Sequence, residues 1–262
     1  MHLGSFFISR YFGAEVFAEF SNGFIQIPLV GMITGATSLV LMPSFSKMIH
    51  EKAKIQELTE LWRSALLKSA VLIYPIVVFF IFQAQTIVVL LYSKIYMNSA
   101  IYFQVAMFIN FFNIIIFAPL LFSLGETKFY FRLHLYFAII AWIGEYLIVT
   151  FFKSPVAIAI FSASVSVSLV LFAIIKVSFL LKVKFAQLFP LKQFSIIIFH
   201  SILIAGLLLI CNHFFFKTTA GWILLIINSL GFSGLILGTS KLFRIDYLST
   251  VRPLIRNVLN RF

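Results

Sequence analysis

The chain has 262 residues, of which 62% are hydrophobic and only 11% are charged. Soluble domains are about a quarter charged and about half apolar, so this composition excludes a soluble globular protein and predicts an all-α, polytopic membrane bundle. The formal net charge of +12 then indicates membrane orientation rather than nucleic-acid binding, because basic residues collect in the loops that stay in the cytoplasm.

The first residues, up to Gly13, are too few and too interrupted for a complete span, and they lack the basic region and cleavage site of a signal peptide. We interpret them as the end of a helix whose beginning is missing. Arg10 is the cation in this apolar approach. We expect it to meet a diphosphate, to pair with an acid, or to extend to the outer interface.

Seven apolar segments are long enough to cross a hydrocarbon core of roughly 30 Å. Each is continuous rather than alternating, which argues for helices and against a barrel. The stretch 84–99 is shorter, and we predict an interfacial helical turn there. The seven segments lie at about 23–45, 64–83, 100–122, 133–152, 156–181, 194–216 and 220–240.

The lysines and arginines are distributed unequally between the two sides of these spans. One side receives three: Lys94, Lys153 and Lys217. This bias predicts that the 46–63 loop and the C-terminus are cytoplasmic. The other side receives fourteen, in its loops and in the tail: Lys47, Lys52, Lys54, Arg63, Lys128, Arg132, Lys182, Lys184, Lys192, Lys241, Arg244, Arg252, Arg256 and Arg261.

Two connections and the tail add to this topology. The connections at 153–155 and 217–219 are short, so the helices that they join are predicted to be antiparallel neighbours. The tail, 241–262, carries apolar residues at helical spacing with arginines between them. This pattern predicts a basic amphipathic segment along the anionic inner leaflet.

Amide side chains stand at the start of the first span and inside the third. Asn22 and Gln26 are four residues apart, so we expect them to share a face of the 23–45 helix. Asn110 and Asn113, three apart, mark one face of the 100–122 helix. Amides in lipid need partners, so these faces point either into the bundle, as packing contacts, or into a wet cavity.

Glu145 is the one acid that falls well inside a span, roughly 10 Å from the outer end of its helix. A charged group there costs at least ~2.5–3.5 kcal/mol unless it meets a partner or a cavity. It is therefore either a functional residue or part of an internal hydrogen bond or ion pair that orders the bundle. Ser162, one of several serines in the following span, is interpreted as a packing residue.

The sequence offers little for catalysis. Its five histidines are scattered singly, Cys211 is its one cysteine, and nucleotide-binding loops and nucleophile motifs are missing. We therefore expect no enzymatic activity, no cofactor and no bound metal. Lys68 and Lys176 lie near cytoplasmic helix ends, where we expect their ammonium groups to reach the interface.

Two short motifs carry a resemblance to a known family. The first lies in the run 11–52, whose long helix closes with Pro43-Ser44-Phe45-Ser46-Lys47, and the second is Leu124-Gly125-Glu126-Thr127-Lys128. With the spacing of the helices between them, they resemble the second lobe of multidrug/oligosaccharidyl-lipid/polysaccharide exporters, most closely the polysaccharide flippases. The related lipid II flippases usually show an Asp-Arg pair where Asn22 and Gly23 stand here, which argues against lipid II as the substrate.

The resemblance implies a domain plan and a function. Residues 1–182 would form the second six-helix lobe, with its first helix truncated and the first lobe absent, and 183–240 would add two helices. The implied function is the transfer of undecaprenyl-diphosphate-linked O-antigen or capsule units from the inner to the outer leaflet of the bacterial plasma membrane. The alternatives to this function are a drug or cation antiporter and a half-sized accessory subunit without transport activity.

The resemblance also implies roles for the polar residues, since the site of such carriers lies between two lobes. The amides would meet sugar hydroxyls, Arg10 the diphosphate, and Glu145 a proton or a sodium ion. The implied partners are the lipid-linked oligosaccharide, membrane lipids, the missing lobe or a second copy of the chain, a polysaccharide polymerase and glycosyltransferases. The candidate substrate-binding residues are Arg10, Asn22, Gln26, Asn110, Asn113 and Glu145.

Overall fold

The structure, a computed structural model, describes residues 3–215 and 221–247. Within these ranges the secondary-structure elements are all helices, and they form seven spans that are long and apolar enough to cross a membrane. The predicted all-α polytopic bundle is therefore confirmed. The spans are α3 (Pro28–His50), α4 (Ile55–Phe82), the broken pair α6 (Ser99–Asn113) and α7 (Ala118–Ser123), α8 (Thr127–Phe151), α9 (Pro155–Leu181), α10 (Leu191–Phe215) and α11 (Gly221–Thr239).

Two helices precede the first span. Helix α1 (Leu3–Tyr11) and helix α2 (Gly13–Gly23) meet at Gly13, whose φ of +83° lies in the left-handed region that glycine adopts without strain. The chain then leaves helical geometry for four residues before α3 begins at Pro28. The prediction of a helix starting at Gly23 is therefore wrong, because the residue before a proline is pushed toward extended backbone; Ile27 has φ −78° and ψ 118°.

This break also separates two candidate residues. Asn22 lies in the last turn of α2, and Gln26 lies in the non-helical break. The prediction that they share one face of a single helix is wrong for the same reason. The predicted 100–122 helix is likewise divided, since α6 ends at Asn113 and α7 begins at Ala118, with Pro119 in its first turn.

The stretch predicted to form an interfacial turn is helical. It contains α5 (Ala84–Tyr92) and a 3₁₀ turn, η1 (Lys94–Tyr96). A second 3₁₀ turn, η2 (Phe185–Leu188), lies between α9 and α10. The first part of the predicted amphipathic tail, 241–247, consists mostly of turns; the remainder, 248–262, lies outside the described residues.

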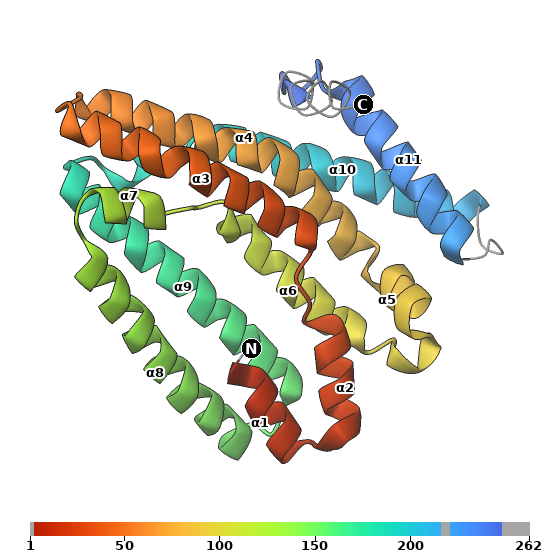
Figure 1. Cartoon of the computed structure of the whole chain (residues 1–262). Coiled ribbons are helices and arrows are strands. Elements are labelled where there is room, and N and C mark those ends of the chain that lie inside the picture. Colours follow the sequence, from red (N-terminus) through yellow and green to blue (C-terminus); the bar gives the residue numbers. More distant parts are fainter. Residues whose placement is uncertain (1–2, 216–220, 248–262) are drawn as a thin grey trace, which may run out of the picture.

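Helix α4 is the centre of the packing. It lies against α6 on one side and α10 on another, with α3 and α5 also in contact (Figure 1). Trp62, Ile73 and Val77 of α4 are completely buried. Helices α8 and α9 form an antiparallel pair against which α1 packs, and α11 lies at the edge of the bundle beside α10 (Figure 1).

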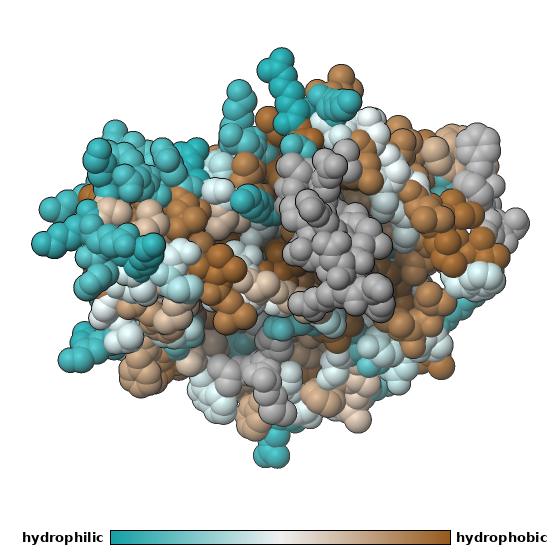
Figure 2. Space-filling view, turned by 45° about the horizontal axis from the view of Figure 1, so that its top comes forward, coloured by the Kyte–Doolittle hydropathy of each residue, from teal (hydrophilic) through white to brown (hydrophobic). Residues whose placement is uncertain are grey.

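The bundle has two chemically distinct ends. What we call the basic end holds the connections 51–54, 124–126 and 182–190 and the segment 240–247, and Arg63 Nη1 there donates to the Gln187 carbonyl oxygen at 3.1 Å. At the opposite end, Asn98 Nδ2 donates to Glu19 Oε1 at 2.9 Å. Figure 2 shows hydrophilic residues gathered where α3 meets α4, and hydrophobic residues over much of the remaining surface.

Candidate functional site

Glu145 is buried where α1, α8 and α9 meet. Its side chain, on α8, is only 1% exposed, and its Oε1 accepts a hydrogen bond of 2.5 Å from Ser162 Oγ on α9. Its Oε2 is buried and has no hydrogen-bond partner among the described residues. From α1, Gly4 approaches so closely that an added Cβ would lie 3.1 Å from Ser162 Oγ and 3.7 Å from Glu145 Oε1. Three helices thus enclose one carboxyl group.

The local sequence explains how Glu145 and Ser162 meet. The short connection 152–154 ends in Ser154, whose Oγ accepts from the Ala157 amide at 3.2 Å and so caps α9. Both residues lie about eight residues, or roughly 12 Å, from this connection, so an antiparallel pair brings them to one level. At that level Gly144 leaves room for the Phe161 ring, which any Cβ would overlap.

This arrangement restricts the chemistry available to Glu145. Within the described ranges, Glu145 forms no ion pair with a lysine, arginine or histidine. Those ranges also hold no group of three His, Cys, Asp or Glu residues that could bind a metal ion. Charge on a carboxyl in such surroundings is costly unless a cation or a proton compensates it. A proton on this carboxyl group would remove that cost. The hydrogen bond to Ser162 also ties two helices together, as the second interpretation of Glu145 requires.

The α6 amides form a pair at the break between α6 and α7. Asn113 Nδ2 donates to Asn110 Oδ1 at 2.8 Å, and Asn110 Nδ2 donates to the Ala106 carbonyl oxygen at 3.2 Å. Asn110 is buried and Asn113 is exposed. The hydroxyl group of Tyr74 on α4 donates to the Phe111 carbonyl oxygen at 3.1 Å and so satisfies one acceptor of this helix end. The predicted shared face is confirmed, with Asn113 at its accessible edge.

The other three candidates are dispersed. Arg10 is exposed at the end of α1, Asn22 is half-buried on α2, and Gln26 is exposed in the break before α3. Within the described part of the chain, the hydrogen bonds and ion pairs join none of these three to Glu145 or to the α6 amides. The candidates therefore comprise a buried carboxyl, an amide pair and three separate side chains, and do not make up a single hydrogen-bonded cluster.

The two short motifs come together at the basic end. Ser46 of the first motif lies 3.0 Å, Oγ to Oγ, from Ser123, which directly precedes the second. Glu126 of the second motif forms an ion pair of 3.1 Å with Lys176 on α9, and the Lys176 ammonium lies 5.3 Å from the Phe129 ring centroid. Lys176, expected at the interface, is thus held by a carboxylate and an aromatic ring.

Sequence reasoning missed the role of Ser162, although a signal was present. In a helical hairpin with a short connection, residues equally distant from the connection face each other, and a serine at that distance from Glu145 is a ready donor. The contact of Gly4 with this centre had no comparable signal, because α1 reaches it through tertiary packing alone.

Comparison with known protein families gives a match over the N-terminal part of the chain. Residues 1–101 match the model of a family described as "Polysaccharide biosynthesis protein". The matched segment runs from α1 to the beginning of α6; it contains the first motif, whereas the second motif and Glu145 lie beyond it. Curated proteins give no match to the chain, and solved structures give none either.

Proposed function

We propose that this protein moves a lipid-linked oligosaccharide across the membrane during surface-polysaccharide synthesis, and that it acts as a transporter and not as an enzyme. The observation that carries this proposal is the match of residues 1–101 to a polysaccharide biosynthesis family. The match falls on a chain with seven helices able to cross a membrane. The resemblance of the two short motifs to those of polysaccharide flippases favours membrane transfer as the step that such a chain performs.

The exposed side of α3 is our proposed wall of the transport path. Little of this helix is buried, and the open space beside Gly31 and Gly35 leaves part of its surface without neighbours. Thr34 and Thr37 donate to carbonyl oxygens of their own helix, at 3.0 and 2.8 Å. Carriers built from two repeats bind their substrate between them, so α3 would face either the other lobe or a second copy of the chain.

In this proposal the substrate is an undecaprenyl-diphosphate-linked O-antigen or capsule unit, and it moves from the inner to the outer leaflet of the bacterial plasma membrane. The basic end, and with it the C-terminus, lies in the cytoplasm, as the distribution of lysine and arginine favours. Arg10 meets the diphosphate, and the exposed amides Gln26 and Asn113 meet sugar hydroxyls. Glu145 takes up a proton or a sodium ion that couples the conformational change to an ion gradient.

The test is deletion of this gene in its native bacterial strain, followed by complementation with variants, with surface polysaccharide as the readout. We expect Glu145→Gln to lower surface polysaccharide by roughly ten-fold, through loss of ion coupling, while the lipid-linked precursor accumulates in the inner leaflet. Glu19→Gln is the matched control, because Glu19 is hydrogen-bonded to Asn98 at the end of the bundle opposite the basic end. This variant should retain activity. Normal surface polysaccharide after deletion of the gene would overturn the transport proposal.

Two further outcomes separate the roles within this proposal. If Glu145→Gln and Arg10→Ala both support normal polysaccharide at normal expression, the cavity and coupling roles fail while transport stands. If the purified chain instead exports dyes along a proton or sodium gradient, the antiporter alternative is correct.

The accessory-subunit alternative is tested on the protein itself. Blue-native electrophoresis and crosslinking show whether the chain forms a dimer, which a two-lobe path requires if the second lobe is another copy of the chain. Partnership with a polymerase or glycosyltransferase is tested by co-purification from the native membrane.

A further inference from the structure

The segment that follows α11 is held against α10 by a buried histidine. His200 of α10 is completely buried, with Nε2 2.7 Å from Thr239 Oγ1 and Nδ1 3.2 Å from the Tyr247 hydroxyl oxygen. The Phe243 ring stacks on the imidazole with centroids 4.2 Å apart and planes at 29°. Three side chains at the end of α11 and in the 240–247 segment thus converge on one ring, which fixes this segment as a wall.

The donor and acceptor of each hydrogen bond in this wall can be assigned by starting at Thr239 and proceeding through His200 to Tyr247. Thr239 Oγ1 donates its own proton to the Leu235 carbonyl oxygen at 2.6 Å, so it accepts from the N–H at His200 Nε2. His200 Nδ1 is then the acceptor for the Tyr247 hydroxyl proton. Burial raises the pKa of Tyr247 to about 12, so this phenol keeps its proton at neutral pH. The wall is therefore satisfied without a buried charge.

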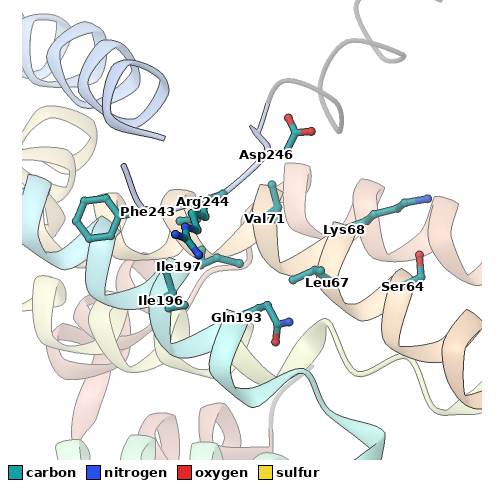
Figure 3. A pocket seen from close by; sticks show the side chains of 11 residues that line it. Ser64, Leu67, Lys68, Val71, Gln193, Ile196, Ile197, Phe243, Arg244 and Asp246 are labelled. Atoms are coloured by element: carbon teal, nitrogen blue, oxygen red, sulfur yellow. The ribbon is translucent and has the colours of Figure 1, made fainter. Parts of the chain in front are cut away.

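A pocket of about 320 Å³ lies between this wall, α4 and α10 (Figure 3). It is lined by two cationic side chains, Lys68 of α4 and Arg244 of the wall. In Figure 3 they lie on opposite sides of Val71, and the Lys68 ammonium group points away from Arg244. Ser64 and Gln193 add neutral polar groups, and the remaining lining is mainly aliphatic, as at Ile196. Asp246 is also part of the lining, so the pocket combines opposite charges with a cationic excess.

A second, apolar pocket adjoins the basic one along α4. Val71 lines both the basic pocket and a second one of about 370 Å³, which lies between α4 and α11. Pro75, Phe79 and Phe232 line this second pocket. A cationic recess beside an apolar pocket matches a molecule with an anionic head and an acyl chain. Basic pockets between transmembrane helices on the cytoplasmic side are known binding sites for anionic lipid head groups.

We propose that this pocket binds an anionic phospholipid, with the phosphodiester at Arg244 and within reach of the flexible Lys68 side chain, and with one acyl chain against Val71 toward the α4–α11 pocket. The bound lipid is a resident partner that joins the end of α11 to α4 and α10, and it is distinct from any transported molecule. A pocket of about 320 Å³ is at the small end for ligand sites and favours a phosphoglycerol head over an oligosaccharide. The inference does not depend on the proposed transport function.

The test measures lipid retention by the purified full-length chain. Native mass spectrometry in micelles containing phosphatidylglycerol and phosphatidylcholine, with identical acyl chains, reports which lipid stays bound. We expect Lys68→Gln/Arg244→Gln to weaken phosphatidylglycerol retention by roughly ten-fold or more. Each cation near a lipid phosphate strengthens binding by roughly five-fold, and the double variant removes two. The matched control is Lys192→Gln/Lys241→Gln, which removes the same charge at the same end outside the pocket lining and should weaken retention less than about two-fold.

A charge-neutral variant provides an independent arm. Ile196→Trp fills the pocket while leaving the net charge unchanged, so it should also reduce phosphatidylglycerol retention, with thermal unfolding in phosphatidylcholine micelles confirming the fold. Equal losses in the two double variants would overturn the proposal in favour of diffuse attraction to the basic end. Retention unaffected by Ile196→Trp would overturn it as well. Competition by millimolar inorganic phosphate as strong as that by phosphatidylglycerol would show a free-phosphate site instead of a lipid site.

Discussion

Helices α3 and α4 are consecutive spans with opposite positions in the bundle. They are joined by a short turn, contain 23 and 28 residues, and both pass as membrane spans by length and composition. Yet 17% of the apolar window of α3 is buried, against 50% of that of α4. In lipid an exposed helix can be as apolar as a packed one, so hydropathy identifies both helices as spans and does not reveal which of them is central.

The side chains that each helix carries explain the difference. Along α4, large residues fill the space between α6 and α10; Trp62 and Ile73 are completely buried. Along α3, Gly31 and Gly35 border open space, while Leu39 and Met32 are 79% and 69% exposed. Helix α4 is therefore a structural axis, whereas α3 has surface available for lipid, for a partner or for a substrate.

The largest effect that tests this contrast is expected at Trp62. Trp62→Ala should destabilise the protein by about 3–5 kcal/mol, because it removes a completely buried indole and leaves a cavity beside Phe45. Leu39→Ala on α3 is the control and should change the free energy of unfolding by less than ~0.5 kcal/mol. Unfolding in mixed micelles with increasing SDS measures both. Similar losses for the two variants would show that α3 is as tightly packed as α4.

The next effect concerns the contact that precedes α3. Gly23→Ala should cost about 1–3 kcal/mol, because the new Cβ would overlap the Ser99 carbonyl oxygen and the Tyr102 side chain on α6. Gly31→Ala, with open space around it, should be neutral or stabilise α3 by up to ~1 kcal/mol. The same unfolding assay compares them. If Gly31→Ala were the more harmful change, the open surface of α3 would have to be covered by something outside the described structure.

How far the sequence predicts this contrast depends on the type of signal. The spans follow from continuous apolar runs, and the antiparallel α8–α9 pair follows from its short connection. The break before α3 was missed because residues 24–27 are mostly apolar, although Pro28 carried the local signal: it disfavours helical backbone at Ile27. Exposure of α3 had no local signal, because it is set by which helices pack around α4.

The candidate site was predictable to a similar extent. Glu145 stood out because a carboxyl group inside a span is costly, and the structure confirms its burial. Asn110 and Asn113 were correctly placed on one face because both lie within a single helix. The wall around His200 was not predictable, since its partners Thr239 and Tyr247 are 39 and 47 residues away and meet it only in the folded bundle.

A third prediction separates stability from function on α3. Gly35→Leu should change the free energy of unfolding by less than ~0.5 kcal/mol, because a Cβ at this position has nothing within 4 Å in the described structure. If α3 lines the transport path, the same change should lower surface polysaccharide by about ten-fold, since it narrows the path. Membrane expression level and surface polysaccharide are measured together in the complementation strain. Full activity with Gly35→Leu would place this part of α3 against lipid.

The smallest expected effect is at the basic end of α3. Ser46 and Ser123 join α3 to the end of α7 through hydroxyl groups 3.0 Å apart. Such bonds between transmembrane helices contribute about 0.6 kcal/mol on average, so a double-mutant cycle with Ser46→Ala and Ser123→Ala should give a coupling energy near that value. Ser44→Ala is the control, because the Ser44 hydroxyl group bonds only within α3, to the Val40 carbonyl oxygen at 2.8 Å, and should not couple to Ser123. A coupling near zero would mean that the hydroxyl pair contributes nothing to the position of α3, which would then depend on packing and on the bond from Ser123 Oγ to the Met42 carbonyl oxygen at 3.5 Å.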